Sequence, residues 1–438
     1  MFFFIFSYYI IMSLPRQLLY ENKINSSYSR NYNSIIQPVN SSTYGLGQTC
    51  VINVPCDSQT ALSGADSVLS MKLKLRNASG ANATAFLNKC GIAGCIQRLR
   101  IYNGSQLLQD IDNYQSLASL LTPFQSSSDE VTGRSRALAG TNELRGDALF
   151  TATATGTDVE RDFAFPLLSI MSMTDNYVPL WAMSGVLRIE IQFVSSIAKF
   201  VNTDVTLTHT ATGANSIFSD VKFQGNFMEL SNTAMDIIQN SLQGRPVEWV
   251  CKSYSNYVYN GTLGTGTTSV SIPVNAKYNS LCGLYVIART FPDGADDRFA
   301  DDTPNFDIKE YSFRLGSKVL PSEKPDTIPQ MLANMEQSLG SVSNRHTPHS
   351  YSLAQITNKI PSTDQSVSNA FCVGLELESY SSTELSSKVY QGYNSSNEDV
   401  FAQITYNGQS SALAVRWDVF ASYDTLIVID NGQISVQY

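Results

Sequence analysis

The sequence predicts an all-β protein made of two antiparallel sandwiches in tandem. Many short segments alternate apolar and polar residues, which is the two-residue period of a half-buried strand, and few segments have a helical period. Charged residues make up 15% of the chain and aromatic residues 11%, a balance typical of strands and long loops. One hairpin-and-helix unit also occurs twice, half a chain apart, which indicates a duplicated domain.

The first copy of this unit begins with a strand at residues 96–102. Asn103-Gly104 follows and predicts a tight hairpin turn, because both residue types tolerate a positive φ. The return strand passes into an apolar spacing of three and four residues. This spacing predicts a helix over 112–121, which Pro123 helps to stop.

The second copy lies at residues 313–339. Gly316-Ser317 supplies its turn, an apolar return strand follows, and a helix is predicted over 328–339. We expect the two helices to occupy equivalent positions in the two sandwiches. The residues expected to pack inward from them are Leu117, Leu121, Met331 and Met335.

The other strands follow one another with turns and polar loops between them. In the first half they are predicted at Thr49–Val54, Ser67–Leu75, Phe163–Leu168, Gly185–Phe193 and Val221–Leu230. In the second half they are predicted at Glu248–Tyr259, Ser269–Val274, Leu281–Arg289, Asp307–Arg314, Ser368–Glu378, Ser411–Phe420, Thr425–Ile429 and Gly432–Gln437. Residues 195–218 are predicted to join the two halves, and Ser231–Leu242 is predicted to be a helix.

The chain has 438 residues, more than one compact core usually covers, so two domains are expected. We place an N-terminal leader or arm at residues 1–44, the first sandwich at 45–200 and the second at 215–438. The run at 1–12 is apolar, but it is too short to span a bilayer and lacks the basic start of a signal peptide. Translation therefore starts either at Met12 or at the first residue, in which case the run is a hydrophobic anchor. We favour Met12, because the sequence after it already has the character of an ordinary polar leader.

Residues 13–44 are rich in Asn, Ser and Tyr and have few large apolar residues in any period. We expect them to form an extended arm rather than part of a core. The basic residues of this arm stand out in an acidic chain and suit lipid head groups or an acidic protein surface. They are Arg16, Lys23 and Arg30.

The composition excludes several functions. A formal net charge of −9 argues against a nucleic-acid-binding surface, which needs clustered Lys and Arg. The cysteines are odd in number and scattered, and no second close pair accompanies Cys90 and Cys95, so a zinc site is not predicted. We expect reduced, buried thiols. The seven cysteines are Cys50, Cys56, Cys90, Cys95, Cys251, Cys282 and Cys372.

No set of residues supplies a nucleophile with a base and an orienting group, so no catalytic, cofactor-binding or metal site is predicted and the chain is not expected to be an enzyme. Besides His209, the chain has His346 and His349, which lie in a polar loop without an acidic ligand near them in the sequence. One acidic cluster lacks EF-hand spacing and is expected to be an exposed loop, and calcium binding there stays open. Its members are Asp293, Asp296, Asp297, Asp301 and Asp302.

Four segments, in their order along the chain, resemble the double jelly-roll major capsid proteins of virophages and polinton-like viruses. RLRIYNGSQLLQDIDNYQSL resembles the hairpin and helix of that family. Residues 163–193, with two Pro-Leu steps, resemble the close of the first jelly roll, and residues 218–238 resemble the strand and helix that open the second. The ending YDTLIVIDNGQISVQY resembles the last strands. The four segments lie between Arg98 and Tyr438, and the resemblance is taken to include the chain from about residue 30 to the end.

The resemblance implies two tandem eight-stranded jelly rolls with short helices between strands, and it implies no catalytic residues. It further implies a homotrimer that is pseudo-hexagonal and tiles the icosahedral shell of a double-stranded DNA virus, located in the virion and assembled inside the infected host cell. The implied partners are further copies of the chain, penton and minor capsid proteins, and an internal membrane reached by the N-terminal arm. No specific nucleic acid is implied.

Two other functions stay open: a minor capsid protein of the penton type, and a carbohydrate-binding jelly roll or adhesin. A penton usually needs only one roll. A lectin would show a single roll, paired cysteines or a signal peptide. A jelly-roll enzyme of the cupin type would need clustered His and Glu ligands, which three loop-like histidines do not supply.

Overall fold

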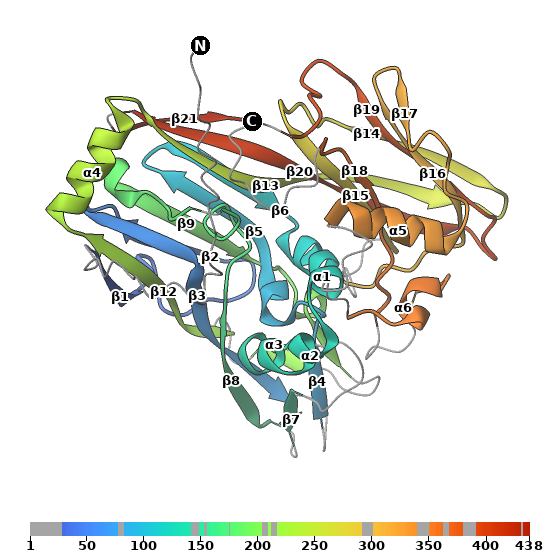
Figure 1. Cartoon of the computed structure of the whole chain (residues 1–438). Helices are drawn as coiled ribbons and strands as arrows, with labels where there is room; N and C mark the ends of the chain where they lie inside the picture. The colour runs from blue at the N-terminus through green and yellow to red at the C-terminus, as the bar shows by residue number, and fades with distance from the viewer. Residues whose placement is uncertain are drawn as a thin grey trace, which may run out of the picture.

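The computed structural model of the chain shows two β-sandwiches that lie side by side (Figure 1). Blue, cyan and green strands build most of the first sandwich, and yellow to red strands build the second. The structure describes residues 29–77, 83–141, 149–152, 156–174, 176–203, 209–211, 217–290, 301–339, 350–361, 368–379, 391–430 and 432–438.

The first sandwich consists of two facing antiparallel sheets. One sheet has the order β1 (Ser29–Ile36), β12 (Phe218–Leu230), β3 (Thr60–Asn77) and β8 (Asp158–Phe165). The other has the order β2 (Thr49–Pro55), β9 (Val186–Phe193), β5 (Ile96–Asn103) and β6 (Gln106–Asp112). Strand β9 shows why these segments pair as they do, because Leu187, Ile189 and Ile191 are buried while the residues between them face outward.

The second sandwich repeats this plan. One sheet has the order β13 (Val247–Leu263), β20 (Leu413–Asp430), β15 (Leu281–Thr290) and β18 (Val373–Glu376), and β21 (Gln433–Gln437) adds to β20. The facing sheet has the order β14 (Thr268–Val274), β19 (Val400–Tyr406), β16 (Ile308–Leu315) and β17 (Lys318–Leu320). Position by position along the chain, β1 corresponds to β13, β5 and β6 to β16 and β17, and β12 to β20. The chain therefore has the strand order of two eight-stranded jelly rolls within its described residues.

The repeated hairpin-and-helix unit occupies equivalent positions, as predicted. In both copies a glycine takes a positive φ at the turn, 56° at Gly104 and 58° at Gly316. The first turn lies one residue later than predicted, at Gly104-Ser105. Helices α1 (Tyr114–Gln125) and α5 (Ile328–Leu339) follow the two hairpins. The four residues expected to pack inward, Leu117, Leu121, Met331 and Met335, are all buried.

The two hairpins also share a cation–aromatic pair, with its partners exchanged. In the first sandwich Tyr102 on β5 lies opposite Arg188 on β9, whose guanidinium carbon is 4.5 Å from the ring centroid. In the second sandwich Arg314 on β16 lies opposite Phe401 on β19, at 4.7 Å. Tyr102 and Arg314 each precede the turn glycine by two residues, so the pairs are equivalent in position.

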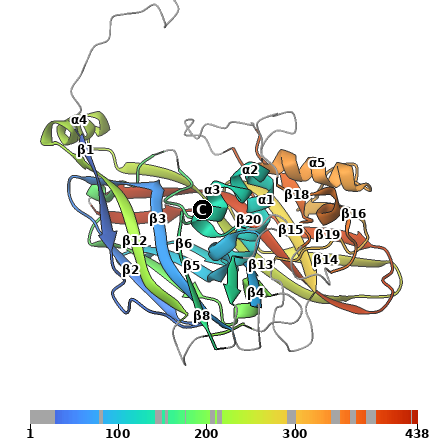
Figure 2. The ribbon, with the colours of Figure 1, turned by 90° about the horizontal axis from the view of Figure 1, so that it is seen from below.

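Shorter elements occupy the connections. A small sheet contains β10 (Val201–Thr203), β4 (Ala83–Leu87) and β7 (Phe150–Ala152), and β11 (His209–Ala211) pairs with β3. The short helices are η2 (Gly91–Cys95), α2 (Ser128–Thr132), α3 (Arg134–Ala139), η3 (Leu180–Ala182), η4 (Ile197–Lys199) and α6 (Leu353–Thr357). Helix α4 (Asn232–Leu242) joins the sandwiches, and Figure 2 shows it with β1 at one end of the molecule, far from β14 and β16.

Strand pairing corrects two assignments made from the sequence. The strand at 218–230 does not open the second jelly roll, because β12 pairs with β1 and β3 of the first. Residues 29–36 are not an extended arm, because they form β1, where Tyr32 stacks on Phe227 with the ring centroids 5.6 Å apart. Tyr44, also placed in the arm, is buried. Residues 1–28 of the predicted arm lie outside the described residues.

Candidate assembly interface

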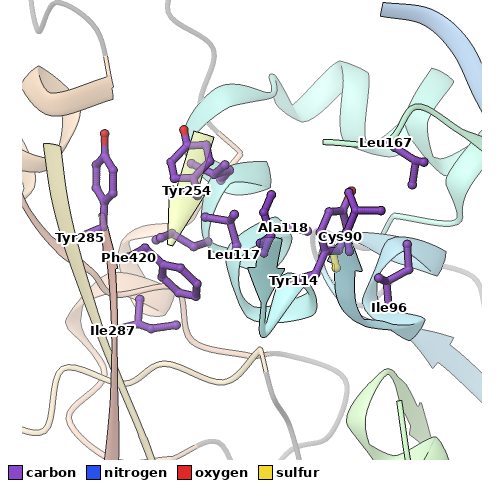
Figure 3. Packing of buried hydrophobic residues seen from close by; sticks show 14 of the residues in the cluster. Cys90, Ile96, Tyr114, Leu117, Ala118, Leu167, Tyr254, Tyr285, Ile287 and Phe420 are labelled. Carbon is purple, nitrogen blue, oxygen red and sulfur yellow. The ribbon is translucent and has the colours of Figure 1, made fainter. Parts of the chain in front are cut away.

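Helix α1 lies between the two sandwiches and forms the centre of their contact, which we call the junction. Figure 3 shows Leu117 and Ala118 directed toward Tyr254 and Phe420 of the second sandwich, while Tyr114 lies on the side of the first. All five side chains are buried. Burying a large apolar side chain stabilises a fold by about 1.5–3 kcal/mol, so the junction holds the two sandwiches together as one packed body.

Strand β6 of the first sandwich lies against β13 of the second. The side chain of Gln109 bonds to both sandwiches: its Nε2 donates to Ser253 Oγ at 3.0 Å, and its Oε1 accepts from the backbone N–H of Ile170 at 2.9 Å. Gln109 is only 1% exposed. A buried amide with both ends satisfied fixes the positions of the elements it joins, because leaving either end unpaired would cost about 1–3 kcal/mol.

The loop that follows β8 lies along the outer edge of β13. The backbone N–H of Lys252 donates to the carbonyl of Met173 at 3.1 Å, and Thr174 Oγ1 donates to the carbonyl of Val250 at 3.0 Å. Trp249 Nε1 donates to the same Thr174 hydroxyl at 3.1 Å. Backbone groups that would otherwise be left open at a sheet edge are thus paired with the first sandwich.

A buried lysine of the first sandwich reaches into the second. The backbone N–H of Lys89 donates to Asp301 Oδ2 at 3.2 Å, and its Nζ donates to the carbonyl of Asn369. Asp301 Oδ2 also accepts from Ser368 Oγ at 2.9 Å, and Asp302 Oδ1 accepts from the backbone N–H of Asn369 at 2.7 Å. Burial lowers the pKa of Lys89, and the two carboxylates oppose this shift.

The same contact corrects the expectation of an exposed acidic loop. Asp301 and Asp302 are 1% and 5% exposed, because they lie beside the buried Lys89 and its partners rather than in solvent. The other members of the predicted cluster, Asp293, Asp296 and Asp297, lie outside the described residues.

A second buried charged group lies beside α1. Asp418 on β20 is fully buried and accepts from Arg289 Nε at 3.1 Å and from Arg416 Nη2 at 3.1 Å. Asn113, which precedes α1, donates to the same carboxylate at 3.5 Å. Removing one partner of a buried ion pair costs about 3–5 kcal/mol, so this group ties the start of α1 to the centre of the second sandwich.

The remaining residues considered in the sequence do not converge on a reactive site. All seven cysteines are free thiols, and burial raises the pKa of Cys90 to about 12, which keeps its thiol protonated at neutral pH. Over the described residues, no group of three His, Cys, Asp or Glu side chains comes together to hold a metal ion. His209 lies on β11, whereas His346 and His349 are outside the described residues. None of the described helices is long and apolar enough to cross a membrane.

No single sequence motif predicts the junction, because its residues come from segments far apart in the chain. Only the apolar face of α1 carried a signal, through its three- and four-residue spacing. Gln109, Lys89 and Asp418 read as ordinary polar residues of strands and loops, and sequence reasoning missed all three. A polar residue inside an otherwise apolar strand, such as Asp418 in β20, is the one hint of a buried group.

No protein-family model and no curated protein matches the chain in sequence. Solved structures match its fold. The Sputnik virophage structure determined by cryo-EM has a TM-score of 0.62 at 11% identity, covering 98% of this chain and 93% of that one. VP54 of PBCV-1, fitted into a reconstruction of Sputnik, has a TM-score of 0.59 at 11% identity, covering 95% and 99%. The mavirus major capsid protein has a TM-score of 0.56 at 12% identity, covering 98% and 96%.

These likenesses extend over nearly the whole of each chain, so they include both sandwiches and their connection. At this level of identity they establish the fold, and the chain has a double jelly-roll fold.

Proposed function

We propose that this chain is a major capsid protein whose trimers build the shell of an icosahedral virus. The observation that carries the proposal is the repetition of one jelly roll, strand for strand, with the two copies locked together by a buried junction. One such chain supplies two nearly equivalent building units. Three chains around a threefold axis supply six such units. A ring of six similar units has the nearly hexagonal outline that a trimer needs to fill a hexagonal lattice.

The solved structures support this assignment beyond the fold itself. The matching mavirus protein is a major capsid protein, and another matching structure is the capsid of PBCV-1, with a TM-score of 0.58 at 13% identity. Their lengths agree with this chain, since more than nine-tenths of each chain is covered. A penton-type or lectin-type single roll would leave one of the two sandwiches without a counterpart.

The buried polar groups are consistent with a structural role. Lys89 and Asp418 are enclosed between the sandwiches and bonded to protein groups, so they hold the units in place and are not open to a substrate. We therefore propose a structural role for these groups and for the chain. Its place is in the virion, after assembly inside the infected cell, beside penton and minor capsid proteins.

The N-terminal segment is proposed to face the capsid interior, where it contacts an internal membrane. Its basic residues Arg16 and Lys23 suit anionic head groups, and the apolar run at 1–12 suits shallow insertion. These residues precede β1, which starts at Ser29 beside α4.

The oligomeric state tests the proposal. Light scattering of the purified protein at micromolar concentration should give about three times the chain mass of 48.1 kDa, and negative-stain images should show particles with hexagonal outlines. A chain that stays monomeric at physiological salt contradicts the proposal. A compact dimer without a hexagonal outline contradicts it as well.

A further inference from the structure

Each of the two surfaces that meet in the junction has an equivalent surface elsewhere on this molecule. Within the chain, β6 of the first sandwich lies against β13 of the second. Because the two sandwiches share one strand order, the counterpart of β6 is β17 and the counterpart of β13 is β1. The second sandwich thus carries a β6-like edge, and the first carries a β13-like edge, without the neighbour that covers each in the junction.

The burial of matching residues reveals this difference on the β17 side. The pairing register matches Leu107, opposite Tyr102, with Val319, opposite Arg314. It matches Gln109, opposite Ile101, with Leu320, opposite Phe313, because Leu108 is an extra residue at a β-bulge in the first hairpin. Gln109 is 1% exposed and bonds to the second sandwich, whereas Leu320 is half-buried. Leu107 is half-buried, whereas Val319 is 43% exposed. Both positions are therefore less exposed in the first sandwich, where β13 lies beside them, than in the second.

The β1 side shows the complementary difference. The outer edge of β13 is covered by the loop that carries Met173 and Thr174. Strand β1 pairs with β12 on one side, and among the described residues no strand pairs with its other side. Its side chains are open too, with Ile35 59% and Tyr32 36% exposed. An uncovered edge with exposed apolar side chains is a ready template for another chain.

We infer that β17 of one subunit packs against β1 of the next, so that the contact between subunits repeats the junction inside each chain. This inference rests on the proposed function and specifies the surfaces that the trimer uses. The occupant of each face is a second copy of this chain, because only that chain carries the matching counterpart of the junction.

The position of the two faces fits this arrangement. In Figure 1 β17 lies at the upper right and β1 at the lower left, at opposite ends of the paired sandwiches. A contact between two different faces is heterologous, and it closes into a ring when the rotation it imposes returns to the start. Three chains joined in this way form a ring of six sandwiches. First and second sandwiches alternate, and each contacts the next through an equivalent pair of strands.

Two charge substitutions test the inference separately from the fold. Val319→Asp introduces a charge on the β17 face and Ile35→Asp on the β1 face, and both replace exposed side chains. Each variant should be monomeric at a concentration where the unchanged protein is trimeric, with a melting temperature close to that protein's. Leu353→Asp, at a residue of α6 that is 79% exposed and outside both faces, is the matched control and should stay trimeric.

Mixing the two variants gives the sharper result. The Val319→Asp chain keeps an intact β1 face, and the Ile35→Asp chain keeps an intact β17 face, so one junction can form between them. An equimolar mixture should therefore contain a heterodimer that neither variant forms alone, measured by sedimentation velocity at tens of micromolar.

The outcomes separate the two levels of the argument. Variants that remain trimeric, or a mixture that remains monomeric, overturn the inferred pairing of β17 with β1 and leave the proposed function standing. An unchanged protein that is monomeric overturns both. Monomeric single variants whose mixture forms the heterodimer establish the pairing.

Discussion

At the scale of single residues, burial controls how this chain responds to alkaline pH. Burial raises the pKa of Cys50 to about 11 and the pKa of Tyr254 and Tyr311 to about 12, whereas exposed thiols and phenols titrate near 9.0 and 10.0. Between these values the unfolded chain loses protons that the folded chain keeps. The folded state therefore binds more protons there, and the free energy of unfolding falls as the pH rises.

We expect the melting temperature to fall steadily between about pH 9 and pH 11. The raised pKa of Cys50 alone corresponds to up to about 3 kcal/mol of unfolding free energy over this interval. Cys50→Ala should lower stability at neutral pH through the small cavity it leaves, but its melting temperature should fall less steeply with pH. Thermal melts of both proteins across the interval measure the two slopes. Equal slopes would show that Cys50 does not contribute.

Single residues also mark where sequence reasoning ends. Free, mostly buried thiols were predicted and are found. Asp301 and Asp302 were expected in solvent, yet they enclose a lysine that lies more than two hundred positions earlier in the chain. No local pattern carries that information, because the pocket forms only when the two sandwiches meet. Acidic loop residues are usually solvated, and the prediction followed the usual case.

At the scale of elements, the hairpin glycines give a direct test of the turn geometry. Gly104 has a φ of 56° with open space around its Cα, so Gly104→Ala adds only the strain of a left-handed backbone. That strain costs roughly 1–2 kcal/mol. Gly266→Ala is the matched control, since Gly266 also has open space but no positive φ. Urea unfolding should show the loss for Gly104→Ala and little change for the control, and equal losses would contradict the assigned turn.

Most elements were predictable, and the errors have identifiable causes. The strand β19 was missed, although its sequence VFAQITY is rich in β-branched and aromatic residues and Val400, Ala402 and Ile404 alternate within it. Strand β20 was predicted as two strands because Asp424 reads as a turn residue. In the structure Asp424 is buried within the strand, where its Oδ2 accepts from Ser280 Oγ at 2.6 Å.

The end of helix α1 also differs from the prediction made from local sequence. Pro123 was expected to help stop it, yet the helix continues to Gln125. A proline removes one backbone donor and crowds the preceding turn, which weakens a helix without always ending it. Here Phe124, just beyond the proline, is buried and packs on Tyr351 at 5.0 Å between ring centroids. Tertiary packing thus outweighs the local signal.

At the scale of the whole molecule, the boundary between leader and sandwich is testable by truncation. Removing residues 1–28 leaves β1 intact, so the trimer and the melting temperature should be retained. Removing residues 1–36 deletes β1 and uncovers Phe227, with which Tyr32 stacks, so stability and trimer formation should both be lost. Light scattering and thermal melts of the two truncated chains check this. If the chain that lacks residues 1–28 is unfolded, the fold begins before β1.

The duplication could be read from the sequence, but the division between its halves could not. Hairpin, turn and helix recur in one order, and that order identified the repeat. Strand β12 was assigned to the wrong half, because the alternation within a strand shows that one face is buried but does not indicate which sheet the strand joins. Pairing with β1 and β3, set by distant segments, places β12 in the first sandwich.

The exchanged cation–aromatic pairs mean that the two hairpins are not interchangeable, although they occupy equivalent positions. Replacing β5 by its counterpart β16 would set Arg314 opposite Arg188, and the reverse exchange would set Tyr102 opposite Phe401. Two arginines directly opposite in a sheet repel each other. A chimaera with β16 in place of β5 should therefore lose both the attraction of the original pair and the pairing of the sheet around it, so each hairpin fits only its own sandwich.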